Sequence, residues 1–199
     1  MDKAPQSLLI IFYRNPVAGK VKTRLAATIG EARALEIFQK LSRHTHMITE
    51  HLPVDKIVYY SDFVDKNDIW SEEIFQKILQ YGDNLGEKMT NAFEEGFKRG
   101  YSHICIIGTD CYELTEQIIG EAFAALQTAD AVIGPARDGG YYLLGMKKLI
   151  SQVFENKNWS TASVFQDTVR DFESLGLQYV ALPVLRDVDR EEDIPEALK

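Results

Sequence analysis

The segment Leu8-Leu9-Ile10-Ile11-Phe12-Tyr13 decides the fold class, because a continuous apolar run of this length predicts a strand covered on both faces. The basic stretch Arg14-Asn15-Pro16-Val17-Ala18-Gly19-Lys20-Val21-Lys22-Thr23-Arg24-Leu25 follows it directly. From Thr28 onward the apolar spacing is helical, and Thr28 with Glu31 is typical of a capping box. A buried strand that leads through a loop into a helix indicates an α/β fold.

The rest of the chain repeats this alternation. Further strands are predicted over residues 56–61, 103–108, 130–135, 141–146 and 178–185. Helices are predicted from residue 85 to about 100, over 115–127 and 163–175, and as a short acidic helix from about 191. The pattern predicts a largely parallel sheet, with one antiparallel hairpin around Gly139-Gly140.

Composition restricts the class of protein. The 199 residues, 45% of them apolar, predict one globular domain over residues 1–199 and exclude collagen-like and disordered classes. The net charge of −8 argues against nucleic-acid and acidic-membrane partners. Cys105 and Cys111 are too few for a disulfide framework, and residues 1–7 precede an apolar run too short for a signal peptide. We therefore expect a cytoplasmic protein.

The basic stretch after the first strand is the first candidate site. Arg14, Lys20, Lys22 and Arg24 form a local concentration of positive charge that suits several phosphate oxygens. The stretch is not a Walker loop, because its first glycine would fall at Arg14 and Val21 replaces the required Ser or Thr. The alternative is a solvated charged loop without a ligand.

Residues 104–110, with the sequence ICIIGTD, form the second candidate. Asp110 ends an apolar strand, where carboxylate oxygens can hold Mg²⁺ or Mn²⁺ while substrate phosphates complete the coordination shell. The alternative is a turn or capping residue before the helix near Thr115. The adjacent Cys111 fits a packing role better than that of a nucleophile.

Two later segments complete the set of candidates. Gly139 and Gly140 permit close approach of the backbone to a ligand, with polar or stacking contacts from Asp138 and Tyr141; the same residues are typical of a hairpin turn. The segment Asp187-Val188-Asp189 can supply the second side of a metal site, or it can be only the acidic start of a helix.

Five motifs in this order resemble one known family. They are Gly19-Lys20-Val21-Lys22-Thr23-Arg24-Leu25, Gly82-Asp83-Asn84-Leu85-Gly86-Glu87-Lys88-Met89, Ile107-Gly108-Thr109-Asp110-Cys111, Gly134-Pro135-Ala136 with Asp138-Gly139-Gly140-Tyr141, and Asp187-Val188-Asp189. The chain resembles the bacterial radical-SAM/selenodomain-associated glycosyltransferases, also linked to arsenosugar biosynthesis, of the nucleotide-diphospho-sugar transferase superfamily. It departs from the family at Tyr112, where Pro is common, and at Arg14, where Lys is frequent.

The resemblance implies a GT-A type, Rossmann-like three-layer α/β/α sandwich with a mostly parallel mixed sheet. It places the nucleotide donor on the loop after the first strand, a metal on Asp110, and the sugar or acceptor on Asp138, Gly139, Gly140 and Tyr141. The residues expected to bind the donor are Gly19, Lys20, Lys22, Thr23, Arg24, Asp83 and Gly86.

These features together predict a metal-assisted glycosyl transfer from a nucleotide sugar to a small-molecule acceptor. Mg²⁺ or Mn²⁺ on Asp110, with Asp187 or Asp189, and the side chains of Lys22 and Arg24 would stabilise the departing diphosphate. One alternative is a nucleotidyltransferase that joins a nucleoside triphosphate to a phosphorylated small molecule and releases pyrophosphate. A second is a catalytically silent nucleotide-binding protein.

Overall fold

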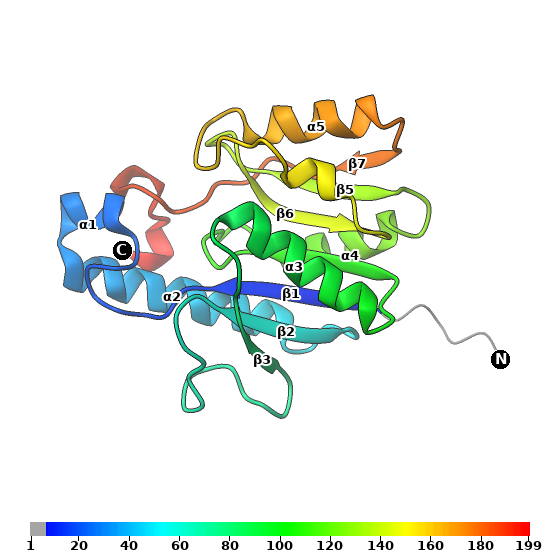
Figure 1. Ribbon diagram of the computed structural model, residues 1–199. Coiled ribbons are helices and arrows are strands. Elements are labelled where there is room, and N and C mark those ends of the chain that lie inside the picture. The colour runs from blue at the N-terminus through cyan, green and yellow to red at the C-terminus, as the bar shows by residue number, and fades with distance from the viewer. Residues whose placement is uncertain (1–6) are drawn as a thin grey trace.

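The fold is built around one twisted sheet, seen in the computed structural model of Figure 1, which describes residues 7–199. The expectation that the first residues form no signal peptide concerns residues 1–6, which lie outside the described part. The sheet has seven strands in the order β3-β2-β1-β4-β6-β5-β7. Their bounds are β1 Ser7–Tyr13, β2 Asp55–Tyr60, β3 Gln76–Leu79, β4 His103–Ile107, β5 Ala131–Pro135, β6 Tyr141–Met146 and β7 Tyr179–Ala181.

The sheet is mixed in the way that the sequence predicts. Strand β1 lies in the middle and pairs in parallel with β2 and β4. Only β6 runs the other way, antiparallel to both β4 and β5, and the turn from β5 to β6 is the predicted hairpin. The α/β class with a mostly parallel mixed sheet is confirmed.

Helices cover both faces of the sheet and form the outer layers (Figure 1). Their bounds are α1 Thr23–Ile29, α2 Glu31–Thr49, α3 Leu85–Lys98, α4 Glu116–Ala125 and α5 Val164–Ser174. Leu9 and Ile11 of β1 share a core with residues of α2 and α4, whereas Leu8 and Ile10 share a second core with residues of α3 and α5. Side chains of a strand alternate between faces, so the continuous apolar run of β1 supplies both cores.

The structure differs from the sequence predictions at a capping box, at an edge strand that was not predicted and at the end of the last strand. Thr28 lies inside α1 and caps nothing, because Gly30, with φ +82°, ends α1 and precedes α2. The edge strand β3 was not predicted, because its sequence QKIL is short and only half-buried. The strand expected over residues 178–185 is shortened to β7, because Pro183 has no backbone N–H for a ladder; beyond it only Leu185 forms a bridge, to Ala136.

The segment after β7 returns across the carboxyl edge of the sheet and packs on the α1–α2 pair (Figure 1). Val188, Ile194 and Leu198 are buried there against residues of both helices. The acidic helix expected from Glu191 is a single 3-10 turn, Glu191–Asp193. The packing carries Asp187 and Asp189 past the end of β4, where the Val188 N–H donates to the Asp110 carbonyl at 2.9 Å. No helix in residues 7–199 is long and apolar enough to cross a membrane.

The β5–β6 hairpin generates a stability prediction. Gly139 has φ +89°, and a Cβ there would lie 2.1 Å from the Ala162 carbonyl oxygen. We expect Gly139→Ala to lower the free energy of unfolding by about 1–3 kcal/mol, measured by thermal or urea unfolding. The control is Gly120→Ala in α4, where a Cβ meets nothing within 4 Å. It should raise stability by about 1 kcal/mol, because alanine favours helix. Equal effects of both substitutions would contradict this account.

Candidate functional site

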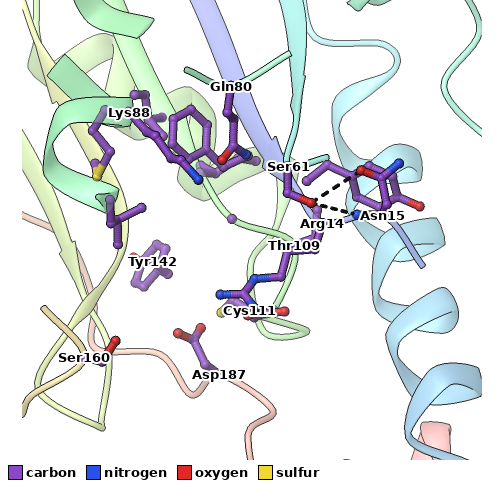
Figure 2. A pocket seen from close by; sticks show the side chains of 18 of the residues that line it. Arg14, Asn15, Ser61, Gln80, Lys88, Thr109, Cys111, Tyr142, Ser160 and Asp187 are labelled. Atoms are coloured by element: carbon purple, nitrogen blue, oxygen red, sulfur yellow. Dashed lines mark hydrogen bonds between the residues drawn. The ribbon is translucent and has the colours of Figure 1, made fainter. Parts of the chain in front are cut away.

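A cavity of about 710 Å³ opens at the carboxyl ends of β1 and β4, where ligands bind in open α/β sheets. Figure 2 shows side chains that line it from several elements: Arg14 and Asn15 follow β1, Ser61 follows β2, Thr109 and Cys111 follow β4, and Lys88 projects from α3. Lys20, Asp83, Asp110, Tyr141 and Asp187 are the predicted site residues that line the cavity.

Lys22 and Asp110 meet at this edge of the sheet, as the sequence analysis expects. The Lys22 side chain is only 3% exposed, and its Nζ lies 2.7 Å from Asp110 Oδ1 and 3.7 Å from Asp189 Oδ1. The 2.7 Å contact lacks hydrogen-bond geometry, and within residues 7–199 Nζ has no hydrogen-bond partner. The ammonium is therefore held by charge alone.

The backbone around Lys22 is unusual. Lys22 precedes α1 in the left-handed conformation, with φ 48° and ψ 45°. Residues with a Cβ seldom adopt this conformation, and it is found at sites where surrounding contacts enforce it. Gly19, with φ +76°, turns the preceding loop at a position suited to glycine. The loop thus directs Lys22 inward, toward the end of β4.

The remaining basic and neighbouring residues of the loop separate into two groups. Lys20 is exposed and lines the cavity. Arg24 instead forms an ion pair with Asp189, whose Oδ2 lies 3.1 Å from Nη1, on the more exposed side of α1. The predicted donor-binding residues of this loop that do not line the cavity are Gly19, Lys22, Thr23 and Arg24, so any donor contact from them requires the ligand to extend beyond it.

Asp187 is the most perturbed acid of the site. Its burial, followed by the charge of Asp110, raises its pKa to about 7, although the ammonium of Lys22 acts in the opposite direction. Its Oδ1 is buried and has no hydrogen-bond partner within residues 7–199. An orphaned carboxylate oxygen beside a second carboxylate suits a hard cation.

The acidic residues do not form a ready-made metal cage. Within residues 7–199 no group of three or more His, Cys, Asp or Glu side chains comes together as a metal site. Asp110 and Asp189 instead flank the Lys22 ammonium. A metal held by Asp110 and Asp187 would need oxygens from a ligand to complete its shell.

The start of α3 forms another wall of the cavity. Asn84 caps the helix by accepting from the Glu87 N–H, while the Glu87 carboxylate accepts from the Asp83 N–H at 2.8 Å. This cap places Lys88 so that its side chain projects into the cavity (Figure 2). Gly86 does not line the cavity; a Cβ there would lie 2.9 Å from the Phe154 carbonyl oxygen, so its role is close packing.

The hairpin contributes less to the cavity than expected. Tyr141 lines it and donates its hydroxyl to Met89 Sδ. Asp138 accepts from the Gly140 N–H and stabilises the turn, and Asp138, Gly139 and Gly140 lie outside the cavity lining. Asp138 is nonetheless near enough for its charge to raise the pKa of Asp187.

Sequence reasoning missed the role of Asn15. This residue is 2% exposed and joins the loop after β1 to the loop after β2. Its Nδ2 donates to the Phe63 carbonyl at 2.9 Å, and its Oδ1 accepts from the N–H groups of Asp62 and Phe63. The sequence signal was a single polar residue between Arg14 and Pro16, which does not predict burial. Gln80 and Ser160, which also line the cavity, gave no signal.

Cys111 does not act as a nucleophile in this geometry. It is 4% exposed, and burial, with the nearby charge of Asp187, raises the pKa of its thiol well above the usual range. A thiol that stays protonated is inert, so the predicted packing role fits its surroundings.

Comparisons with known proteins agree with this architecture. The family described as "Uncharacterized protein conserved in bacteria (DUF2064)" matches residues 45–161. A crystal structure described as a "putative nucleotide-diphospho-sugar transferase" from Desulfovibrio desulfuricans G20 is 31% identical, with a TM-score of 0.87, and the match covers 94% of this chain and 84% of that one. A search of curated proteins found no match.

More distant solved structures share the fold alone. An inositol-1-phosphate CTP transferase from T. maritima is 11% identical, with a TM-score of 0.58 over 98% of this chain and 94% of that one. The 4-diphosphocytidyl-2C-methyl-D-erythritol synthase from Anaerococcus prevotii is 12% identical, with a TM-score of 0.57 over 95% of this chain and 92% of that one.

The raised pKa of Asp187 predicts a pH-dependent effect of Asp187→Asn on the metal-free protein. Between about pH 4 and the native pKa of about 7, the native state holds a proton that the unfolded state releases, so the wild type loses stability as pH rises through this window. The asparagine of Asp187→Asn does not titrate, so the variant does not lose this stability as pH rises. We expect the difference in melting temperature, Asp187→Asn minus wild type, to be more positive at about pH 8 than at about pH 5.

The measurement is thermal unfolding in EDTA at both pH values. Glu192→Gln removes an exposed carboxylate from the same segment and is the control. If the difference between Asp187→Asn and wild type were the same at both pH values, Asp187 would not carry the perturbed charge.

Proposed function

The chain belongs to the bacterial family DUF2064 and to the nucleotide-diphospho-sugar transferase superfamily, and from this premise we propose that it is a metal-dependent glycosyltransferase. Its donor would be a nucleotide sugar and its acceptor a small molecule. The observation that carries the proposal is the contact of the buried Lys22 ammonium with Asp110 at the carboxyl end of β4, where Asp110 lines a cavity of about 710 Å³.

Lys22, Lys20 and Arg14 would bind the donor diphosphate. Lys20 and Arg14 are exposed and line the cavity, and the Lys22 Nζ lacks a hydrogen-bond partner among the described residues. Lysine and arginine donate charge-assisted hydrogen bonds to phosphate oxygens, and arginine can do so in a bidentate way. Gathered at one edge of the sheet, these donors can stabilise charge that develops on the departing nucleoside diphosphate.

Asp110 and Asp187 would hold Mg²⁺ or Mn²⁺. Both line the cavity, and the buried Asp187 Oδ1 has no other partner among the described residues, so the donor set fits a hard cation. The bound cation would supply neutralisation of negative charge on the donor phosphates. Asp189 is better placed as the residue that holds Lys22 and Arg24, because its two oxygens already face these cations.

The sugar and acceptor would lie on the β6 and α5 side of the cavity. Tyr141, Tyr142 and Ser160 line the cavity. Tyr142 and Ser160 lie on the opposite side of it from the backbone of Arg14 (Figure 2). Aromatic faces and hydroxyl groups suit a sugar ring, which presents apolar C–H surface and polar edges.

One observation favours the alternative of nucleotidyl transfer. Lys88 projects into the cavity from α3, away from the basic loop after β1, and is a second place for an anionic group (Figure 2). A phosphorylated acceptor would use it. Product analysis separates the two reactions: release of a nucleoside diphosphate from a nucleotide sugar supports glycosyl transfer, and release of pyrophosphate from a nucleoside triphosphate supports nucleotidyl transfer.

A third outcome is binding without turnover. A panel of nucleotide sugars and nucleoside triphosphates is screened with Mn²⁺ by thermal shift, because a ligand of the native state raises the melting temperature. Bound ligands that give neither transfer nor donor hydrolysis would support a catalytically silent nucleotide-binding protein instead.

The proposal predicts the effect of Asp110→Asn. Loss of the carboxylate removes a metal ligand, so Mn²⁺ should no longer strengthen the binding of any nucleotide that it strengthens in the wild type. The measurement is isothermal titration of that nucleotide with Mn²⁺ and with EDTA. Glu192→Gln, an exposed carboxylate outside the cavity lining, is the control and should retain the Mn²⁺ effect. An unchanged Mn²⁺ effect in Asp110→Asn would remove Asp110 from this role.

A further inference from the structure

We propose that Lys22 is an internal counter-ion that keeps a divalent cation off Asp110 until a polyphosphate draws the ammonium away. Metal and polyphosphate would then bind as a coupled pair, and metal alone would bind weakly. This inference rests on the proposed function of the same cavity and adds an order of events to it.

The first step concerns the place that the ammonium occupies. Lys22 Nζ lies 2.7 Å from Asp110 Oδ1 and 3.7 Å from Asp189 Oδ1. It is also near enough for its charge to lower the pKa of Asp187, against the effect of burial. The single positive charge of Lys22 thus interacts with the carboxylates of Asp110, Asp187 and Asp189, at the edge where the proposed metal would bind.

The second step concerns repulsion. A divalent cation on Asp110 would lie close to the ammonium, and two positive charges at such a distance repel strongly where water cannot screen them. The Lys22 side chain is only 3% exposed whereas that of Asp110 is 46% exposed, so water screens the contact from the Asp110 side alone. Metal binding therefore requires the ammonium to move or to gain a negative partner.

The third step concerns what the ammonium lacks. Burial of a charged donor without a hydrogen bond is costly, and within residues 7–199 Nζ has no hydrogen-bond partner. Phosphate oxygens would provide both negative charge and acceptors. Lys20 and Arg14 line the cavity together with Asp110 and would hold the other oxygens of the ligand.

Reciprocity follows from these steps. If a polyphosphate strengthens metal binding by taking Lys22 from Asp110, then the metal strengthens polyphosphate binding by the same factor. Loss of the Asp110 charge should also strengthen metal-free polyphosphate binding, because Lys22 no longer pairs with Asp110. A lysine that only stabilises the loop would produce neither effect.

The first experiment titrates the full chain with Mn²⁺ alone, without any phosphate, and follows free Mn²⁺ by electron paramagnetic resonance. Lys22→Met should bind Mn²⁺ more tightly than wild type by a factor on the order of ten, because the competing charge is gone. Lys20→Met removes the same charge from the exposed loop and should match wild type. Lys22→Arg keeps the charge and should also match wild type.

A second experiment does not depend on the folding of Lys22→Met. The affinity for inorganic pyrophosphate in EDTA is measured for wild type, Asp110→Asn and Asp83→Asn. Asp110→Asn should bind pyrophosphate more tightly than wild type by several-fold, whereas Asp83→Asn, which removes a carboxylate from the cavity without touching Lys22, should change the affinity less.

Two results would overturn the inference. One is a Mn²⁺ affinity that is equal in wild type and Lys22→Met, or equally raised in Lys20→Met. The other is a pyrophosphate affinity that Asp110→Asn does not raise above that of Asp83→Asn. Failure of the proposed function is distinguishable, because it would show as an absence of nucleotide binding with Mn²⁺ in the wild type.

Discussion

The charge contact between the buried Lys22 and the partly exposed Asp110 is the constraint on which the cavity depends. It joins the loop after β1 to the end of β4, and Val188, whose N–H donates to the Asp110 carbonyl, adds the C-terminal segment to the same point. Three parts of the chain that are distant in sequence thus converge at one edge of the sheet. The parallel strands β1 and β4 make this possible, because neighbouring parallel strands end at the same edge.

The apolar core explains why a charged site can exist there at all. Leu8 to Ile11 of β1 are fully buried and feed both cores, so the end of the strand is rigidly placed. Arg14 and Asn15 follow within two residues of the last buried side chain of β1, and Asn15 fixes the adjacent loop with hydrogen bonds. The strands are held by their apolar cores rather than by these polar groups, so they can support the polar groups in a defined position.

Sequence patterns predicted what depends on local chemistry. The runs of β1, β4 and β5 are continuous and apolar, so their strands and the α/β class followed from periodicity, and Asp110 followed from its place after β4. Burial of Asn15, the left-handed backbone of Lys22 and the half-buried strand β3 depend on contacts made by distant residues, and no local pattern encodes them. The division of Asp187 and Asp189 into different roles likewise depends on which oxygen faces Lys22. The single-domain organisation and the roles of the site residues stay predictions.

A comparison within the chain separates structural from functional burial of charge. Lys77 is as buried as Lys22, with 3% of its side chain exposed, but its Nζ lies 2.9 Å from Asp68 Oδ1 and donates to the Asp65 carbonyl, while Tyr60 donates to the other Asp68 oxygen. That network is satisfied and needs no ligand. In residues 7–199 the buried side-chain atoms without a hydrogen-bond partner are Trp70 Nε1, Lys22 Nζ and Asp187 Oδ1. Asp187 lines the cavity, and Lys22 contacts Asp110, which also lines it. An unsatisfied donor and an unsatisfied acceptor of opposite charge, both close to Asp110, would be completed by a ligand with anionic oxygens together with a cation. The network around Lys77 offers no such pair of unsatisfied groups.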